Sequence, residues 1–247
     1  MTREITKGPW GTAQLKLRRG SDVSEIAAFR LPLIAPRKSI THDMAKNTFQ
    51  LLANDIAYIK LSSIKRADIP GYMERAAQTK GLTIDIRNYP SDFVPFALGA
   101  YFIDAPTKFV RFTVADLVNP GGFKWGHELS LMPQASRYAG KVMILVDETF
   151  HSQSEYTAMA LRVGSRAKVV GSTTAGADGN VSSIPLAGGL RSLISGIGVF
   201  YPDKLPTQRV GIVPDLEAVD KINNEVVACY LNVEGACHGN QTLTLQH

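Results

Sequence analysis

Cysteine is scarce in this sequence. The 247 residues include two, Cys229 and Cys237, both near the C-terminus. The pair can form a disulfide in an oxidising compartment or remain as free thiols, and the sequence leaves both possibilities open. No Cys or His lies near them at the spacing of zinc ligands. We therefore expect no metal site, and the sequence indicates no cofactor.

Long apolar runs and concentrated charge are also missing. No stretch of about 18 consecutive apolar residues occurs, so we expect no transmembrane helix. Residues 1–7 lack the apolar core of a signal peptide, so either the protein is cytoplasmic or the chain lacks its true beginning. The net charge is +5, and the Lys and Arg residues are scattered. A nucleic-acid partner is therefore not expected.

The chain does contain alternating strand and helix patterns. Its length suits one sizeable α/β domain and a smaller module. Apolar runs predict strands, and apolar residues at i, i+3, i+4 and i+7 predict a helix. The predicted strands are 57–61, 82–86, 142–146 and 167–170, and the predicted helix begins at Ile69 and is ended by Gly81. This order predicts a layered α/β core containing a right-handed βαβ unit.

The stretch 141–164 organises the rest of the chain. Val142–Val146 is a continuous apolar run, typical of a strand buried on both faces. A helical pattern follows and ends at Gly164. Ser152 lies in the polar turn between them, beside N–H groups that could stabilise an oxyanion. The arrangement resembles a nucleophile elbow without its Gly-x-Ser-x-Gly pattern. By itself the stretch favours Ser152 as an ordinary helix cap, since serine is a preferred residue at that position.

Other segments are less informative. Residues 92–140 are rich in Phe, Pro and Gly, with a clear turn at 119–122. Trp125 and its neighbours Phe123 and His127 could line a pocket, although we favour packing. Further on, 172–180 is a predicted loop, 188–189 a turn and 193–200 a strand.

The N-terminal residues 1–35 predict two strands, 13–19 and 23–31, separated by a turn. Two strands need further partners. The Gly-Thr-x-x-x-Leu-x-x-Arg-Arg run, followed by a strand ending in Arg30, resembles the last strands of a PDZ domain. We therefore expect 1–35 to be the C-terminal half of a PDZ-like β domain in a longer protein. Residues 36–54 are predicted as a connector, 55–222 as the α/β core and 223–247 as an unassigned tail.

Several short motifs occur in a characteristic order. They are Tyr58-Ile-Lys60-Leu, Gly81-Leu-Thr-Ile-Asp85-Ile-Arg87-Asn-Tyr-Pro90, Leu145-Val-Asp-Glu-Thr-Phe-His-Ser152-Gln-Ser-Glu155, Val170-Gly-Ser-Thr-Thr174-Ala-Gly176 and Gly211-Ile-Val-Pro214-Asp215. Together they resemble the carboxy-terminal processing (tail-specific) serine peptidases over about residues 55–217. The resemblance implies a ClpP/crotonase-like α/β core.

The resemblance also implies roles for individual residues. The family's Ser-x-Ser-Glu pattern assigns Ser152 as nucleophile and Glu155 as an orienting residue, with Ser154 the weaker alternative. The oxyanion donors would be the N–H groups of Gln153 and of Ser91, where the family has Pro-Gly-Gly and this chain has Pro-Ser-Asp. The supporting residues implied in the same way are Asp85, Arg87, Thr174 and Gly176.

The general base departs from the family pattern. The family's lysine and glutamine correspond to Ala177 and Val181, and neither can accept a proton. Serine needs a base to act as a nucleophile. We take Lys60 as the leading candidate, because a desolvated lysine can have a lowered pKa. The other candidates are His151, Asp178, His127 and His42.

Three functional hypotheses follow. The first is a serine endopeptidase of the tail-specific type, in an atypical subgroup without the usual lysine, which acts on a polypeptide through an acyl-enzyme at Ser152. The second is an inactive ligand-binding module, because modules of the interphotoreceptor retinoid-binding protein resemble this family and bind apolar ligands. The third is a non-functional truncation. The resemblance places the full-length parent in the secreted, periplasmic or cell-envelope class, while the oligomeric state stays open.

Overall fold

The computed structural model describes most of the chain as two separate units. The described residues are 11–30, 47–52, 55–217 and 244–245. One unit comprises residues 1–41 and the other residues 42–247. Within the described ranges, no helix is both long enough and apolar enough to span a bilayer. Cys229, Cys237 and His42 lie outside the described residues.

The described residues of the first unit, 11–30, form a β-hairpin. β1 (Gly11–Arg19) pairs antiparallel with β2 (Asp22–Arg30), and Arg19 faces Asp22 at the turn. The two predicted strands are therefore confirmed. Most of their side chains are exposed, as expected for two strands with one covered face at most. The PDZ-like assignment stays a prediction, because a hairpin occurs in many folds.

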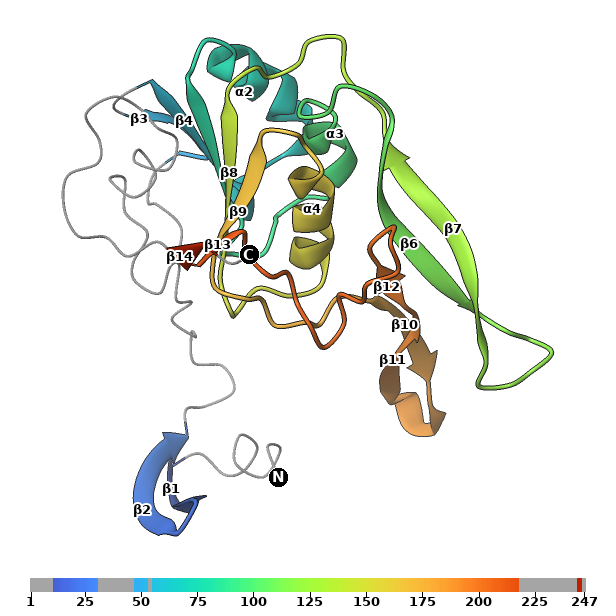
Figure 1. The fold of residues 1–247 in the computed structure, drawn as a ribbon. Coiled ribbons are helices and arrows are strands. Elements are labelled where there is room, and N and C mark those ends of the chain that lie inside the picture. The colour runs from blue at the N-terminus through green and yellow to red at the C-terminus, as the bar shows by residue number, and fades with distance from the viewer. Residues whose placement is uncertain (1–10, 31–46, 53–54, 218–243, 246–247) are drawn as a thin grey trace. The chain divides into compact units, whose positions relative to one another are not determined.

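The second unit is built on a seven-stranded sheet of order β14-β13-β9-β8-β5-β4-β3 (Figure 1). Neighbouring strands from β13 to β4 run parallel, while β3 and β14 are antiparallel at the two edges. The bounds are β3 (Phe49–Leu52), β4 (Ile56–Lys60), β5 (Gly81–Asp85), β8 (Lys141–Val146), β9 (Ala167–Gly171), β13 (Leu216–Glu217) and β14 (Thr244–Leu245). The four predicted core strands are thus confirmed.

In the described part of the chain, three α-helices and three short 3-10 helices accompany the sheet. They are α2 (Ile69–Ala76), α3 (Pro95–Gly99), α4 (Gln153–Arg162), η1 (Leu61–Ser63), η2 (Arg66–Asp68) and η3 (Ala187–Gly189). Helix α2 begins at Ile69 as predicted, ends at Ala76 before the predicted stop at Gly81, and connects the parallel strands β4 and β5, which confirms the βαβ unit. Its apolar positions Ile69, Met73 and Ala76 are buried. Helices α3 and α4 lie side by side (Figure 1).

A second layer comes from the region with the weakest sequence signal. β6 (Thr107–Ala115), β7 (Phe123–Leu131) and β12 (Val199–Phe200) form an antiparallel sheet of order β12-β6-β7. The predicted turn at 119–122 joins β6 to β7. Trp125 packs edge-on against Phe200, with ring centroids 5.0 Å apart, so the packing role favoured for it is confirmed. Charged residues are irregularly spaced along β6 and β7, so the sequence of this region shows no clear strand pattern.

A two-stranded ribbon completes the unit. β10 (Asn180–Pro185) pairs with β11 (Arg191–Ile197) and with no other described strand. The strand predicted at 193–200 is divided at Gly198 into β11 and β12. The predicted loop at 172–180 is confirmed up to residue 179.

The domain boundaries need one correction. Residues 36–54 were predicted as a connector, yet residues 49–52 form β3, an edge strand of the main sheet. Phe49 is buried in the core and stacks on Tyr72 of α2. The tail 223–247 also contributes a strand, β14, which pairs with β13. Both strands are too short to stand out from the polar residues around them.

Candidate active site

The turn between β8 and α4 holds Ser152 in an unusual conformation. Every residue of β8 after Lys141 is buried, and the Asp147 carboxylate accepts the Thr149 N–H at 3.0 Å to begin the turn. Buried Phe150 anchors the turn to the core. Ser152 follows with φ 55° and ψ −128°, a region that residues with a side chain rarely adopt. A strained serine between a buried strand and a helix is the geometry of a nucleophile elbow.

Glu155 ties Ser152 to the loop that follows β9. Its buried carboxylate accepts the Ser152 N–H at 3.2 Å, the Gly176 N–H at 2.8 Å and the Ala177 N–H at 2.9 Å. It also accepts the Thr174 hydroxyl at 2.5 Å. Four donors from two segments therefore converge on one buried carboxylate, an arrangement that fixes both segments.

The segment around Gly211 braces the same loop. Thr174 Oγ1 accepts the Ile212 N–H at 2.7 Å, and Gly176 O accepts the Arg209 N–H at 2.7 Å. Asp215 accepts the Val169 N–H and pairs with Arg162 of α4 at 3.2 Å. The motif from Gly211 to Asp215 thus connects β9, α4 and the loop.

A cavity of about 510 Å³ opens beside Ser152. Its wall is largely aromatic and apolar, with a few polar groups. The lining residues are Tyr89, Phe93, Phe112, Val114, His127, Ser152, Gln153, Tyr156, Asp178, Gly179, Asn180, Val181, Ile197 and Val199. Sites that bind small molecules or side chains have this volume and this mixture of groups.

Asp178 is the buried acid of the cavity. It is 4% exposed, and among the described residues Oδ2 has no hydrogen-bond partner. Burial, followed by the nearby charge of Glu155, raises the pKa of Asp178 to about 7. The same surroundings affect Tyr156, whose pKa is raised by burial and by the charge of Asp178. The cavity therefore places a proton acceptor poised near neutral pH in the same small space as Ser152.

The other candidate bases lie in different positions. His127 of β7 lines the cavity, and its ring lies beside that of Phe112 at a centroid distance of 5.2 Å. The residue therefore both packs, as favoured from the sequence, and lines the pocket. His151 is exposed, donates from Nδ1 to the Thr149 carbonyl at 3.0 Å and lies against Tyr89. Lys60 ends β4 opposite Asp85 and is not part of the cavity wall. The leading candidate from the sequence is thus not among the residues that line this cavity.

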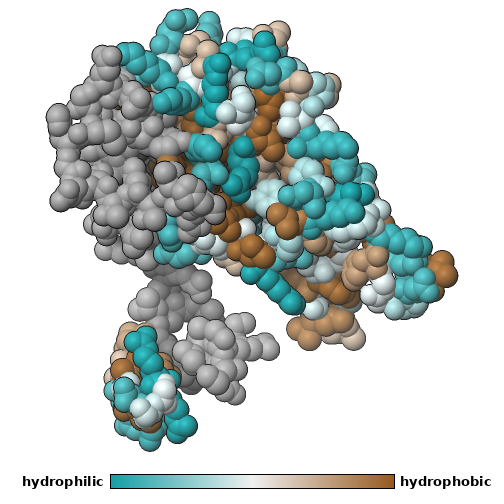
Figure 2. All heavy atoms as spheres, viewed as in Figure 1, coloured by the Kyte–Doolittle hydropathy of each residue, from teal (hydrophilic) through white to brown (hydrophobic). Residues whose placement is uncertain are grey.

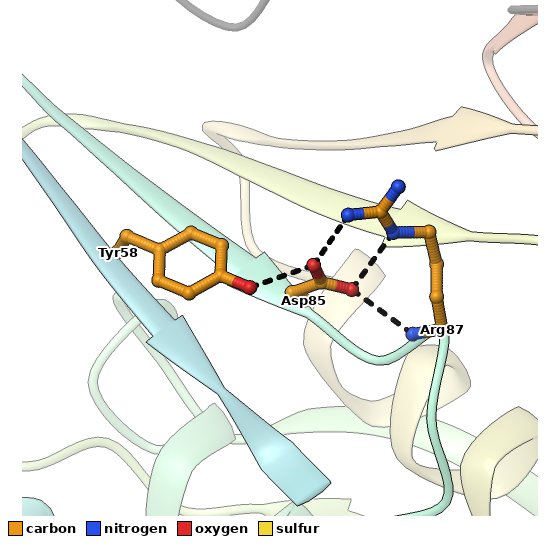
Figure 3. Close-up of polar contacts among 3 residues, drawn as sticks. All are labelled: Tyr58, Asp85 and Arg87. Atoms are coloured by element: carbon orange, nitrogen blue, oxygen red, sulfur yellow. Dashed lines mark hydrogen bonds and ion pairs between the residues drawn. The ribbon is translucent and has the colours of Figure 1, made fainter. Parts of the chain in front are cut away.

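The turn after β5 is fixed by a second buried carboxylate (Figure 3). Asp85 accepts the Tyr58 hydroxyl at 2.8 Å, Arg87 Nη2 at 2.6 Å, Arg87 Nε at 3.0 Å and the Arg87 N–H at 3.1 Å. Burial opposes the charge of Arg87, but the hydrogen bonds and charge of Asp85 outweigh it and raise the pKa of Arg87. Asp85 and Arg87 therefore hold the turn that carries Tyr89 into the cavity wall.

The oxyanion prediction needs a correction at Ser91. Its N–H donates to Leu61 O at 2.9 Å, and its hydroxyl donates to Ile64 O at 2.6 Å. Both donors of Ser91 are thus already used to hold the turn, so the prediction that its N–H faces a substrate is wrong for this structure. Gln153, the first residue of α4, lines the cavity, and its side-chain amide donates to Asp92 O at 3.0 Å.

Part of the cavity wall was not predicted. Tyr89 and Phe93 come from the connection between β5 and α3, Phe112 from β6 and Tyr156 from α4. Only the abundance of Phe in residues 92–140 hinted at an aromatic cluster. Phe93 and Phe112 each lie near the Tyr156 ring, at centroid distances of 5.9 and 6.4 Å. The wall is assembled by tertiary contacts that no local pattern encodes.

Solved structures share this fold. A putative peptidase from Parabacteroides merdae has a TM-score of 0.62 at 20% identity, covering 72% of this chain and 59% of that one. The photosystem II D1 C-terminal processing protease has a TM-score of 0.57 at 17% identity, covering 92% and 61%. Mature CPAF has a TM-score of 0.62 at 13% identity, covering 96% and 70%. At these identities the likeness establishes the fold.

The chain spans about three fifths of the length of the first two of these structures. A search of curated proteins gives no significant match. The sequence itself matches Peptidase family S41 over residues 55–218, well over half of the chain. The predicted α/β class and ClpP/crotonase-like core agree with that match and with the neighbouring folds. This chain therefore belongs to peptidase family S41.

Proposed function

We propose that the chain is the core of a serine endopeptidase of the tail-specific type, with Ser152 as nucleophile and Asp178 as general base. The observation that carries the proposal is the shared cavity: a strained serine and a buried carboxyl with a pKa of about 7 line the same wall. A buried carboxylate is a stronger base than an exposed one and suits proton transfer near neutral pH.

The reaction uses these groups in two stages. The Ser152 hydroxyl proton passes to Asp178 as Oγ bonds to the peptide carbonyl carbon. The Gln153 N–H and the N-terminus of α4 stabilise the resulting oxyanion. The C–N bond breaks, the amine takes the proton from Asp178, and an acyl-enzyme remains on Ser152. Water then gives a proton to Asp178 and bonds to the ester carbonyl carbon. The ester C–O bond breaks, Ser152 Oγ takes that proton from Asp178, and the acid product leaves.

Glu155, Asp85 and Arg87 act as positioning residues in this scheme. Glu155 holds the Ser152 N–H and the two N–H groups that precede Asp178, so it fixes nucleophile and base together. Asp85 and Arg87 fix the turn that carries Tyr89. The substrate in this proposal is a polypeptide, and the secreted or cell-envelope placement of the parent protein stays a prediction from the family resemblance.

A fluorophosphonate probe tests the nucleophile. The wild-type chain should be labelled, Ser152→Ala should not be, and Ser154→Ala should still be labelled. Ser154 is a suitable control because it is a serine of the same helix turn with 1% exposure. Hydrolysis of labelled casein should fall by roughly 10⁶-fold in Ser152→Ala. Labelling that persists in Ser152→Ala would exclude it as the nucleophile.

A ligand-binding module is the second candidate. The 510 Å³ apolar cavity and the Ala at position 177, where the family has its lysine, favour it. Its test is saturable binding of retinol or a fluorescent fatty acid to a chain that the probe does not label. Phe112→Ala, which removes part of the cavity wall, should then weaken the binding.

A further inference from the structure

Strand β10 has an unpaired edge. It pairs antiparallel with β11, and no other strand among the described residues joins it. β11 lies beside β6. The outer edge of the ribbon is therefore formed by the main chain of β10. An exposed strand edge can accept a further strand.

The register shows which groups face outward. The Leu186 N–H donates to Leu190 O at 2.8 Å, which makes these two residues a hydrogen-bonded pair. Hydrogen-bonded and non-bonded pairs alternate along an antiparallel ladder. Pro185, Ser183 and Val181 face Arg191, Leu193 and Ser195 in non-bonded pairs, so their main-chain groups point away from β11. Pro185 fits this assignment, because proline lacks the N–H that such a position would leave unpaired.

This edge is continuous with the cavity. Gly179, Asn180 and Val181 line the cavity with Ser152, and β10 runs outward from them. A register shift between Asn180 and Val181 marks the point where the strand leaves the site. A peptide that reaches Ser152 therefore has the free edge of β10 directly beside its path.

The ribbon also offers apolar side chains on both of its faces. Every residue of β10 is exposed, and Leu193 and Ile194 of β11 are 70% and 52% exposed. Leu193 lies opposite Ser183 on one face, and Ile194 lies opposite Ser182 on the other. Figure 2 shows brown surface over this part of the molecule. An added strand would therefore find apolar contacts for alternate side chains on either face.

We propose that the outer edge of β10 binds the polypeptide substrate as an additional β-strand, with main-chain hydrogen bonds to Val181 and Ser183. This mode gives affinity through the backbone and leaves side-chain selection to the cavity. It rests on the proposed function, since it describes how the substrate of that site is held. It also explains an otherwise exposed two-stranded ribbon beside the nucleophile.

The substitution Ser183→Pro tests the edge. It removes an outward-facing N–H and leaves the ladder with β11 intact. We expect kcat/KM for labelled casein to fall roughly tenfold, the effect of one lost main-chain hydrogen bond. Hydrolysis of p-nitrophenyl butyrate and fluorophosphonate labelling should stay at the wild-type level, because these small molecules reach Ser152 without the edge. Ser183→Ala keeps the N–H and should cleave casein within about twofold of wild type.

A substrate series provides a test on the unmodified chain. Each peptide of the series is an internally quenched octapeptide that the wild type cleaves, with one backbone amide replaced by an ester. The ester lacks the N–H, and its position differs from one peptide to the next. Cleavage should weaken at every second position, because alternate N–H groups of a paired strand face β10.

Four outcomes overturn the inference. If Ser183→Pro is labelled and cleaves casein like the wild type, the proposed edge contact is refuted while the proposed function stands. An ester effect that is equal at all positions leads to the same conclusion. A change of oligomeric state in Ser183→Pro, with casein cleavage unchanged, assigns the edge to a second copy of the chain. A wild-type chain that the probe does not label instead overturns the proposed function, and the inference with it.

Discussion

Strands β8 and β10 are both six residues long and both lead to the cavity, yet their surroundings differ completely. β8 lies between β5 and β9 with five of its six residues buried, whereas all six residues of β10 are exposed. β8 ends six residues before Ser152, and β10 begins two residues after Asp178. The proposed nucleophile thus follows a buried central strand, while the proposed base and substrate edge border an exposed ribbon.

After the loss expected for Ser152→Ala, the largest effect should come from removing the proposed base beside β10. Asp178→Asn should lower kcat/KM by about 10²–10⁴-fold, the usual contribution of a general base. In the wild type, activity should rise with pH through about 7 as Asp178 loses its proton. The pH–rate profile of casein hydrolysis checks this. His127→Gln is the matched control from the same cavity, and a larger loss there than in Asp178→Asn would assign the base to His127.

The same substitution in the two regions measures their difference in stability. Ile144→Ala in β8 should lower the free energy of unfolding by about 2–5 kcal/mol, because it leaves a cavity in the core. Ile194→Ala in the ribbon should change it by less than about 0.5 kcal/mol, because that side chain is half exposed. Urea unfolding of both variants checks the pair. Similar losses would show that the ribbon is covered in solution.

Stability should also depend on pH through Asp178. Its pKa is raised in the folded state from 3.8 to about 7, so the native chain binds more protons than the unfolded chain between these values. The contribution of Asp178 to the free energy of unfolding is therefore fully present below about pH 4 and is lost as pH rises to about 7. It amounts to at most about 4 kcal/mol. Asp178→Asn should remove that part of the slope. An unchanged slope of unfolding free energy against pH in the variant would contradict the burial of the carboxyl.

The smallest expected effect concerns the strain at Ser152. Ser152→Gly should raise the free energy of unfolding by roughly 1 kcal/mol while abolishing casein hydrolysis, because glycine adopts positive φ without a steric cost. Ser152→Ala keeps the side-chain carbon and should show no such gain. Differential scanning calorimetry of the two variants, neither able to hydrolyse the substrate, separates backbone strain from chemistry. Equal melting temperatures would argue against a strained turn.

The comparison of β8 with β10 also explains which elements could be predicted. β8 has a continuous apolar run because both of its faces are buried, so its own residues predict its burial. β10 mixes Val, Ser, Ile and Pro without a period, because neither face is covered and its pairing depends on β11. The strands in residues 107–131 were not predicted for a related reason: β6 and β7 are only partly buried, so their apolar residues follow no clear period.

The sequence by itself determined the parallel core, helix α2 and the position of Ser152 in the turn before α4, because these follow from short-range periodicity and turn chemistry. Only the tertiary structure decided what surrounds that serine. It brings Asp178 into the same cavity across 26 residues, leaves Lys60 outside its wall and commits the Ser91 N–H to Leu61. Burial, a pKa and a hydrogen-bond partner belong to the packed environment, and no local pattern specifies them.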